Sequence, residues 1–304
     1  IGEALHKIRL KDRDKETIYY AYVTDDNRKL VRVVSLRQLL FTIPEVSIKD
    51  IASDRVVKVS TETPQGEVAQ LMKRYDLIAL PVVDREDRLV GIITIDDVVD
   101  ILEEEATEDI QKLAGVSGGD EAALSPPLVT LRKRLPWLLG NIGLYIGAAG
   151  AIAPFQGVIA LVPVLAVIMP ILSNTSGNVA IQALSVTVRG LGVGEVTPKD
   201  TWKILHKEVT AGLGTALALG LALGILSLIW SPPQERWVAI VAASVMAVNV
   251  FVAATLGTVL PMGLKRLNLD PALISGPLLT TILDAVGFLT FLSLISLFLK
   301  VFGN

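Results

Sequence analysis

The sequence predicts a fold of two parts: an α/β unit built from two repeats, followed by an all-α domain of five membrane-spanning helices. Charged residues concentrate in the first 134 positions, because only 14 of the 59 Asp, Glu, Lys and Arg side chains lie between Leu135 and Asn304. After that point, apolar runs of the ~20 residues that a bilayer requires recur several times. The first part instead carries two similar segments of alternating apolar and polar residues, which is typical of small stacked α/β units.

Two segments of the first part are copies of each other. Residues 82–97, Val-Val-Asp-Arg-Glu-Asp-Arg-Leu-Val-Gly-Ile-Ile-Thr-Ile-Asp-Asp, predict a strand, a charged turn, a second strand and the start of a helix. Residues 23–38 repeat this pattern 59 positions earlier, with Ser35 in the place of Thr94 as the hydroxyl that caps the helix. This arrangement resembles the CBS pair, a regulatory module that often binds adenine nucleotides between its halves.

The resemblance to a CBS pair implies a site for ATP or AMP. In that family a carboxylate three positions after the capping hydroxyl contacts the ribose. Thr94 is followed by Asp97, which makes these two the candidate nucleotide-binding residues, whereas Ser35 is followed by Gln38, a poorer acceptor. The alternative, in which Thr94 and Asp97 only cap and solvate a helix, remains open.

The stretch from Asp84 to Asp109 is strongly acidic. It contains eleven acids and two arginines, a net charge of −9 in a chain whose total is −3. Spacings of three and four residues place several of these acids on one helical face, where like charges repel: Asp97, Asp100, Glu104 and Glu108. Because Mg²⁺ and Ca²⁺ take oxygen ligands, one hypothesis is a low-affinity divalent cation site. The other is a solvated acidic face, which the helix dipole favours only in the first turn.

Five apolar runs of the second part are long enough to cross a bilayer: residues 135–155, 158–188, 209–230, 237–264 and 272–299. Lys and Arg gather before the first run, between the second and third, and between the fourth and fifth. Because Lys and Arg favour the cytoplasmic side, the α/β unit is predicted to be cytoplasmic and the C-terminus external.

Asp284 is the only charged residue between Pro271 and Leu299, and it falls near the middle of the fifth run. An ionised side chain at that depth costs ~2.5–3.5 kcal/mol even on the gentler insertion scale. No basic residue of any predicted span can pair with it, so a mobile cation is the favoured partner. The alternative is a protonated Asp284 that bonds to a neighbouring Ser, Thr or Asn.

The second run carries an unusually polar segment, residues 170–182, with the sequence Pro-Ile-Leu-Ser-Asn-Thr-Ser-Gly-Asn-Val-Ala-Ile-Gln. Gly177 allows close approach of another backbone. The surrounding side chains offer neutral oxygens and amides suited to ion-bound water, although such residues also hold membrane helices together: Ser173, Asn174, Thr175, Ser176, Asn178 and Gln182.

Residues 170–190 and 260–287 resemble the MgtE family of bacterial and archaeal magnesium channels. The family order of CBS pair, acidic connecting helix and five spans covers essentially the whole chain. It implies a first CBS repeat at 1–48, incomplete at its start, a second at 49–103, an acidic connecting helix and amphipathic segment at 104–134, and a five-helix transmembrane pore domain at 135–304.

The resemblance also implies a homodimer in the inner (plasma) membrane of a prokaryote, with the pore between subunits and lined by the second and fifth spans. The implied pore residues are Asp284, Gly177, Asn178, Asn174, Ser176 and Thr281. The implied gating acids are Asp97, Asp100, Glu104, Glu105 and Glu108. The family usually has a further acidic helical domain before the CBS pair, which this sequence lacks, so we expect weaker cation sensitivity.

The function expected from these features is a Mg²⁺ channel that is gated by cytosolic Mg²⁺. Permeation by Mn²⁺, Co²⁺ or Ca²⁺ is left open, and no nucleic-acid partner is expected. Two alternatives remain: a divalent cation antiporter, and a membrane-anchored nucleotide or Mg²⁺ sensor that conducts nothing. An enzyme is disfavoured, because the histidines are His6 and His206 alone, cysteine is absent, and no nucleophile–base pair stands out.

Overall fold

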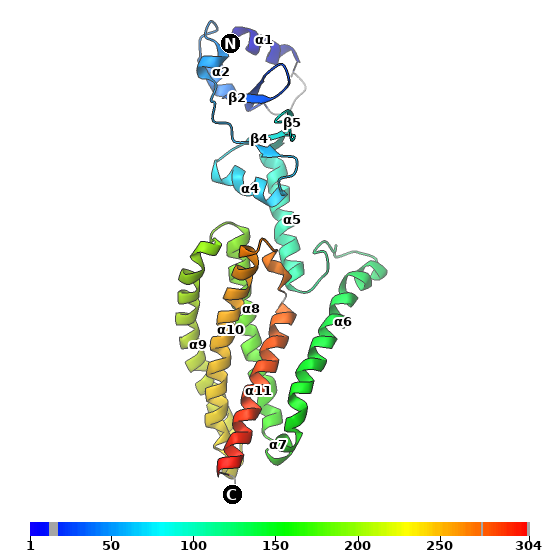
Figure 1. Cartoon of the computed structure of the whole chain (residues 1–304), viewed down its shortest axis with the longest axis vertical. Coiled ribbons are helices and arrows are strands. Elements are labelled where there is room, and N and C mark those ends of the chain that lie inside the picture. Colours follow the sequence, from blue (N-terminus) through cyan, green and yellow to red (C-terminus); the bar gives the residue numbers. More distant parts are fainter. Residues whose placement is uncertain (12–17, 275, 303–304) are drawn as a thin grey trace. The chain divides into compact units, whose positions relative to one another are not determined.

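The computed structural model describes residues 1–11, 18–274 and 276–302 and contains two compact units, Ile1–Glu105 and Ala106–Asn304 (Figure 1). The boundary falls inside one helix, α5 (Ile95–Leu113), which starts in the second repeat and continues without interruption. The acidic connecting helix is therefore not an element that begins near residue 104, but the C-terminal half of a helix that begins at the second repeat.

The first unit contains the two predicted α/β repeats. The first repeat comprises α1 (Gly2–Lys11), β1 (Tyr20–Thr24), β2 (Leu30–Ser35), α2 (Leu36–Phe41) and α3 (Ile48–Ile51), with β1 antiparallel to β2. The second repeat comprises β3 (Val59–Ser60), α4 (Gln65–Arg74), β4 (Ala79–Val83), β5 (Leu89–Thr94) and the start of α5. Its sheet has the order β3-β4-β5, in which β3 is parallel and β5 antiparallel to β4.

The turns of the two hairpins bind each other symmetrically. Arg28 and Asp87 are related by the predicted offset of 59 residues, and both adopt positive φ, 64° and 68°. The N–H of Leu30 donates to the carbonyl of Asp87 (3.1 Å), and the N–H of Leu89 donates to the carbonyl of Arg28 (2.9 Å). This exchange confirms that the two segments form a pair of related units.

Both repeats begin a helix with the same side-chain arrangement. Ser35 caps α2, where its Oγ accepts from the N–H of Gln38 (3.2 Å) and its own N–H donates to Gln38 Oε1 (3.0 Å). In the second repeat, the N–H and the hydroxyl of Thr94 each donate to Asp97 Oδ2 at 2.9 Å. In both repeats, the side chain three residues after the hydroxyl accepts a hydrogen bond from the capping residue at the helix start. This side chain is the amide of Gln38 in the first repeat and the carboxylate of Asp97 in the second.

The second unit contains five long helices, and Figure 1 shows them running side by side. They are α6 (Pro127–Ile152), α8 (Leu165–Gly192), α9 (Thr201–Trp230), α10 (Val238–Arg266) and α11 (Gly276–Phe302). α10 packs against α9, α8 and α11, and α11 also packs against α8 and α6. The main apolar core lies where α8, α10 and α11 meet, around Ile168, Met246 and Phe291.

The helix bounds differ from those of the first two predicted spans. The first long helix starts at Pro127 rather than near residue 135, since proline is well placed in the first turn of a helix. The second span does not begin at 158, because α7 (Gln156–Leu161) ends before Pro163 and α8 starts at Leu165. Proline lacks a backbone N–H and disfavours helical geometry in the preceding residue, so the chain turns there.

Four stretches of the described residues are long and apolar enough to cross a membrane: Pro127–Leu161, Pro198–Trp230, Val238–Arg266 and Gly276–Val301. α8 is 28 residues long but is not among them. Its middle carries the polar segment 170–182, which lowers its apolar character. The second predicted span is thus a helix of sufficient length that does not reach the apolar character of the other four.

Candidate ion site

Asp284 lies at the contact between α11 and α8. Its side chain is 8% exposed and accepts a hydrogen bond from the hydroxyl of Ser173. Within residues 1–11, 18–274 and 276–302, Asp284 makes no ion pair. Among the residues that the structure describes, this buried carboxylate therefore has one neutral hydroxyl donor and no cation to balance its charge.

The two helices approach closely next to this carboxylate. A Cβ atom placed on Gly177 would lie 2.9 Å from Thr280 Cγ2, so a residue larger than glycine would push α8 and α11 apart. Ser176 is fully buried, and its hydroxyl donates to the carbonyls of Leu172 (2.9 Å) and Ser173 (3.0 Å) within α8. The structure places Gly177 and Ser176 in the helix packing beside Asp284.

A different face of α8 presents a row of exposed amides. Asn174, Asn178 and Gln182 follow one another at intervals of four residues, and all three are exposed; we call them the amide stripe. The other side of the same helix turns is buried in the bundle: Leu172, Ser176, Ala180 and Leu184. Because hydrocarbon offers an amide no hydrogen-bond partner, this face needs water or another polar surface.

Thr281 connects α11 to α6 and is 3% exposed. Its hydroxyl lies 3.2 Å from Asn141 Oδ1 on α6 and 2.8 Å from the carbonyl of Pro277. Asn141 was missed by the sequence analysis, as was Asn249 on α10, which is 1% exposed. Both are lone polar residues in apolar runs, the same signal that identified Asp284.

The predicted gating acids all lie on α5, but they do not form a ready-made metal site. Asp97, Asp100, Glu104 and Glu105 are exposed and Glu108 is half-buried. In the part of the chain that the structure describes, no three acidic or histidine side chains converge to hold an ion. A cation bound at α5 would therefore need ligands from a second source.

Two of these acids have partners inside their own unit. A Cβ atom on Gly66 would lie 3.0 Å from the carboxylate of Glu105, so Glu105 rests on the first turn of α4, which has no side-chain cap. A helix N-terminus stabilises a nearby carboxylate. In the second unit, Glu108 Oε1 lies 2.5 Å from Lys112 Nζ. The expected repulsion along this face of α5 is wrong for Glu108, because Lys112 one turn later neutralises it.

Lys112 also reaches the segment before α11. Its Nζ donates to Asp270 Oδ2 at 2.7 Å, while Asp270 Oδ1 accepts from the N–H of Ala272 and starts the short helix η4 (Pro271–Leu273). Burial alone would lower the pKa of Lys112, but the bonds to Asp270 and Glu108 outweigh it and raise that pKa. The ammonium therefore stays charged between two carboxylates.

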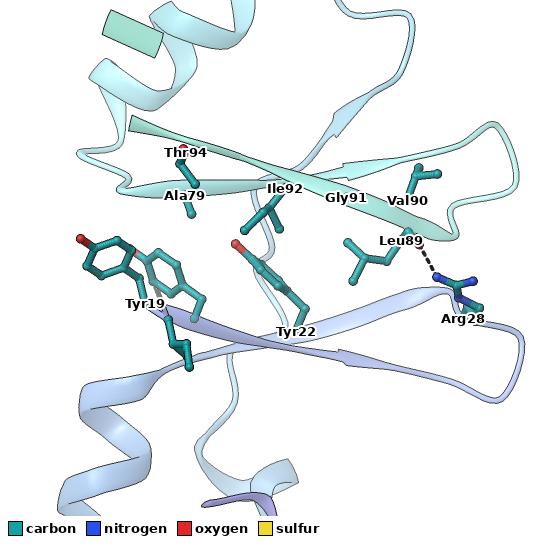
Figure 2. A pocket seen from close by; sticks show the side chains of 11 residues that line it. Tyr19, Tyr22, Arg28, Ala79, Leu89, Val90, Gly91, Ile92 and Thr94 are labelled. Carbon is teal, nitrogen blue, oxygen red and sulfur yellow. Dashed lines mark hydrogen bonds between the residues drawn. The ribbon is translucent and has the colours of Figure 1, made fainter. Parts of the chain in front are cut away.

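The first unit holds a cavity of about 320 Å³ between the two repeats (Figure 2). Tyr19 and Tyr22 line it from the first repeat and Ile92 and Thr94 from the second, with Arg28 at one end. Burial, with a smaller contribution from Tyr20, raises the pKa of Tyr22 to about 12. Of the two predicted nucleotide residues, Thr94 lines the cavity. Asp97 is not among the lining residues, and its Oδ2 is bound to Thr94.

Comparison with known proteins decides the family. The model of the MgtE family, described as divalent cation transporters, matches residues 169–294, and the CBS domain model matches residues 48–104. The magnesium transporter MgtE of Thermus thermophilus is 38% identical over 301 residues, which cover 99% of this chain and 66% of that protein. That of Enterococcus faecalis is 34% identical over 302 residues, with the same two coverages.

The chain belongs to the MgtE family. The resemblance drawn from residues 170–190 and 260–287 is confirmed, since both segments lie within the matched range. The MgtE family is one of transporters rather than enzymes. The chain spans just under two thirds, 66%, of the length of these curated MgtE proteins.

Two solved structures each match about a third of the chain. The cytosolic domain of the Mg²⁺ channel MgtE in complex with ATP is 49% identical, and the match covers 33% of this chain and 40% of that one, with a TM-score of 0.32. The soluble part of a magnesium transporter is 40% identical and covers 34% of this chain and 41% of that one, with a TM-score of 0.34.

Proposed function

We propose that this chain conducts Mg²⁺ across a membrane along the side of α8 that carries the amide stripe, with Asp284 as the residue that attracts the ion. The observation that carries the proposal is a buried carboxylate, without a protein cation, beside a row of exposed amides. Ser173, which donates to Asp284, directly precedes Asn174 of the stripe. Because Mg²⁺ dehydrates reluctantly, amide oxygens and nitrogens would contact its water shell.

We propose that two copies of the chain pair in the bilayer and enclose this path between them. A polar row on the surface of one copy gains partners if a second copy and water cover it. A two-fold axis would bring two Asp284 carboxylates to the same path, where they would repel each other unless a divalent cation lay between them. The family resemblance supports the same arrangement.

Gating by cytosolic Mg²⁺ is proposed to act through the exposed acids of α5. Asp97, Asp100 and Glu104 make no ion pair with a basic side chain in the described residues. Since the described residues of one chain form no complete metal site, a cation would be shared with a second element or a second copy. Joint replacement of these three acids by amides should release uptake from inhibition by internal Mg²⁺. If internal Mg²⁺ still inhibits uptake by the variant at the same concentration as in the wild type, this role is refuted.

A nucleotide is proposed to bind in the cavity of the first unit. Tyr19 and Tyr22 offer aromatic faces for a base, Thr94 a hydroxyl for ribose, and Arg28 a cation for phosphate. Calorimetric titration of ATP and AMP into the full chain tests this, with Tyr22→Ala expected to weaken binding at least tenfold. If Tyr22→Ala binds nucleotide as tightly as the wild type, the nucleotide does not bind in this cavity.

The proposed membrane is the prokaryotic inner membrane, with the first unit in the cytoplasm. Basic residues gather at the start of α6 and α9 and at the end of α8 and α10. They are Arg132, Lys133 and Arg134 on α6, Arg189 on α8, Lys203 and Lys207 on α9, and Lys265 and Arg266 on α10. Because cytoplasmic loops are rich in Lys and Arg, this pattern supports that orientation.

The decisive experiment is Mg²⁺ uptake into liposomes that contain the purified chain, with low or high Mg²⁺ on the cytoplasmic face. Asp284→Asn should abolish uptake, and high internal Mg²⁺ should suppress it in the wild type. Competition by Mn²⁺, Co²⁺ and Ca²⁺ then measures selectivity. Dependence on an opposing proton or sodium gradient would indicate an antiporter, whereas ATP binding without any flux would indicate a sensor.

A further inference from the structure

Asn249, in the middle of α10, is a buried amide that has no hydrogen-bond partner in the part of the chain that the structure describes. Its side chain is 1% exposed, and neither Nδ2 nor Oδ1 has a hydrogen-bond partner among the described residues. The amide lies against α11 at Gly287: a Cβ atom there would overlap Asn249 Nδ2 and come within 3.2 Å of its Cγ. Gly287 therefore provides the space that the Asn249 amide occupies.

The surroundings of Asn249 make an apolar residue the more stable choice. Its neighbours on the buried side of α10 are Val245, Met246, Val250 and Ala253, all members of the apolar cores. A buried amide that lacks hydrogen bonds destabilises a fold, and a leucine of similar size would carry no such cost. A lone polar residue within a membrane helix is by default a functional candidate.

The chemistry of a helix surface limits what can satisfy this amide. The turn of α11 from Leu283 to Gly287 offers backbone carbonyls, whose second lone pair can accept from Nδ2. Its N–H groups are used within the helix, so they cannot serve Oδ1. A water molecule both donates and accepts, and buried waters characteristically satisfy groups of this kind.

The same turn of α11 carries Asp284. We propose that Asn249 holds a buried water against the Leu283–Gly287 turn and thereby fixes that turn from the α10 side, so that Asn249 is a positioning residue for the ion site. Asp284 is then held by contacts from two helices: the Ser173 hydroxyl on α8, and the Asn249 amide on α10, which packs at Gly287 three residues further along α11. This inference rests on the proposed role of Asp284 in conduction.

The test is the concentration dependence of Mg²⁺ uptake into liposomes, together with thermal unfolding of the same full-length variants in detergent. Asn249→Leu should raise the Mg²⁺ concentration for half-maximal uptake about tenfold and change the maximal rate less, as expected for lost binding. Its unfolding midpoint should stay equal or rise. Asn249→Ser keeps a hydroxyl that can hold water, and should stay within about threefold of the wild type.

Gly287→Ala gives a second, independent perturbation. It leaves Asn249 in the sequence but displaces its amide, and should shift half-maximal uptake in the same direction as Asn249→Leu. Gly214→Ala on α9 is the matched control, because nothing lies within 4 Å of a Cβ at that position; it should behave as wild type.

Unchanged half-maximal uptake in both Asn249→Leu and Gly287→Ala would overturn the proposal. Asp284→Asn is measured alongside. If it abolishes uptake while the Asn249 variants are silent, only the positioning role fails. If it leaves uptake unchanged, the conduction site itself is wrong, and this inference fails with it.

Discussion

The ammonium of Lys112 lies 2.7 Å from Oδ2 of Asp270. This ion pair connects the last turn of α5 to the residue that caps η4, the short helix before α11. The side chains are 24% and 35% exposed, so the pair is only partly screened by solvent. Asp270 also starts η4 through its other oxygen. The end of α5 and the start of the short helix η4 thus share one carboxylate.

A double-mutant cycle should measure this attachment. Because the pair is partly exposed, Lys112→Met and Asp270→Asn should couple by roughly 0.5–1 kcal/mol in the free energy of unfolding. The coupling should shrink as salt is raised from about 0.05 M to about 0.5 M, because the screening length becomes shorter. Lys203→Met, at an 86% exposed side chain, is the control. Coupling that does not change with salt would contradict an electrostatic origin.

Gly177→Ala should destabilise the contact between α8 and α11. The added Cβ would lie 2.9 Å from Thr280 Cγ2, and overpacking of this kind costs about 1–3 kcal/mol. Thr280→Ser removes the methyl group concerned, so the double variant should recover most of the lost stability. Chemical unfolding in detergent measures both. No recovery in the double variant would mean that the Gly177 backbone itself is required.

Replacement of the amide stripe by leucine should separate conduction from folding. The three substitutions Asn174→Leu, Asn178→Leu and Gln182→Leu change exposed positions, so the unfolding midpoint should stay equal or rise. Mg²⁺ uptake should fall at least about tenfold for every two substitutions, because a tenfold change corresponds to the free energy of one or two lost polar contacts. Thr215→Leu, an exposed polar position on α9, is the matched control. Full uptake after all three changes would show that the stripe does not line the ion path.

Tyr22 should make the first unit sensitive to alkali. Its pKa in the folded chain is about 12, against an ordinary value of 10.0, because its hydroxyl is buried. The unfolded chain therefore loses this proton first, and stability should decline as the pH rises from about 10 towards 12. Ultraviolet titration should show one late tyrosinate that Tyr22→Phe removes. An unchanged titration curve in Tyr22→Phe would contradict burial of this hydroxyl.

The architecture was predictable because it depends on signals that stay local in the sequence. Apolar runs of sufficient length gave the five long helices, and the offset of 59 residues gave the paired hairpins that bind at Arg28 and Asp87. The turn at Pro163 was also visible in principle, but it was hidden by the continuous apolar character on either side.

The site was predictable only in part, because its contacts depend on helix packing. A lone carboxylate pointed to Asp284, yet nothing local assigns Ser173 as its donor or places Gly287 against Asn249. The predicted gating acids show the converse limit. Their spacing predicted a common face, but only the folded unit shows that Glu105 rests on the first turn of α4.

The unbroken course of α5 has a thermodynamic consequence. Its nineteen residues begin at Ile95, directly after Thr94, which lines the cavity of the first unit, and its last turn holds Lys112. Suppose that a ligand at the first turn changes the stability of α5, and that an ion near the last turns also changes it. The two binding free energies are then coupled, and linkage requires each ligand to alter the affinity of the other by the same factor. The saturation curve for nucleotide, measured at several Mg²⁺ concentrations, would therefore report on the far end of the helix.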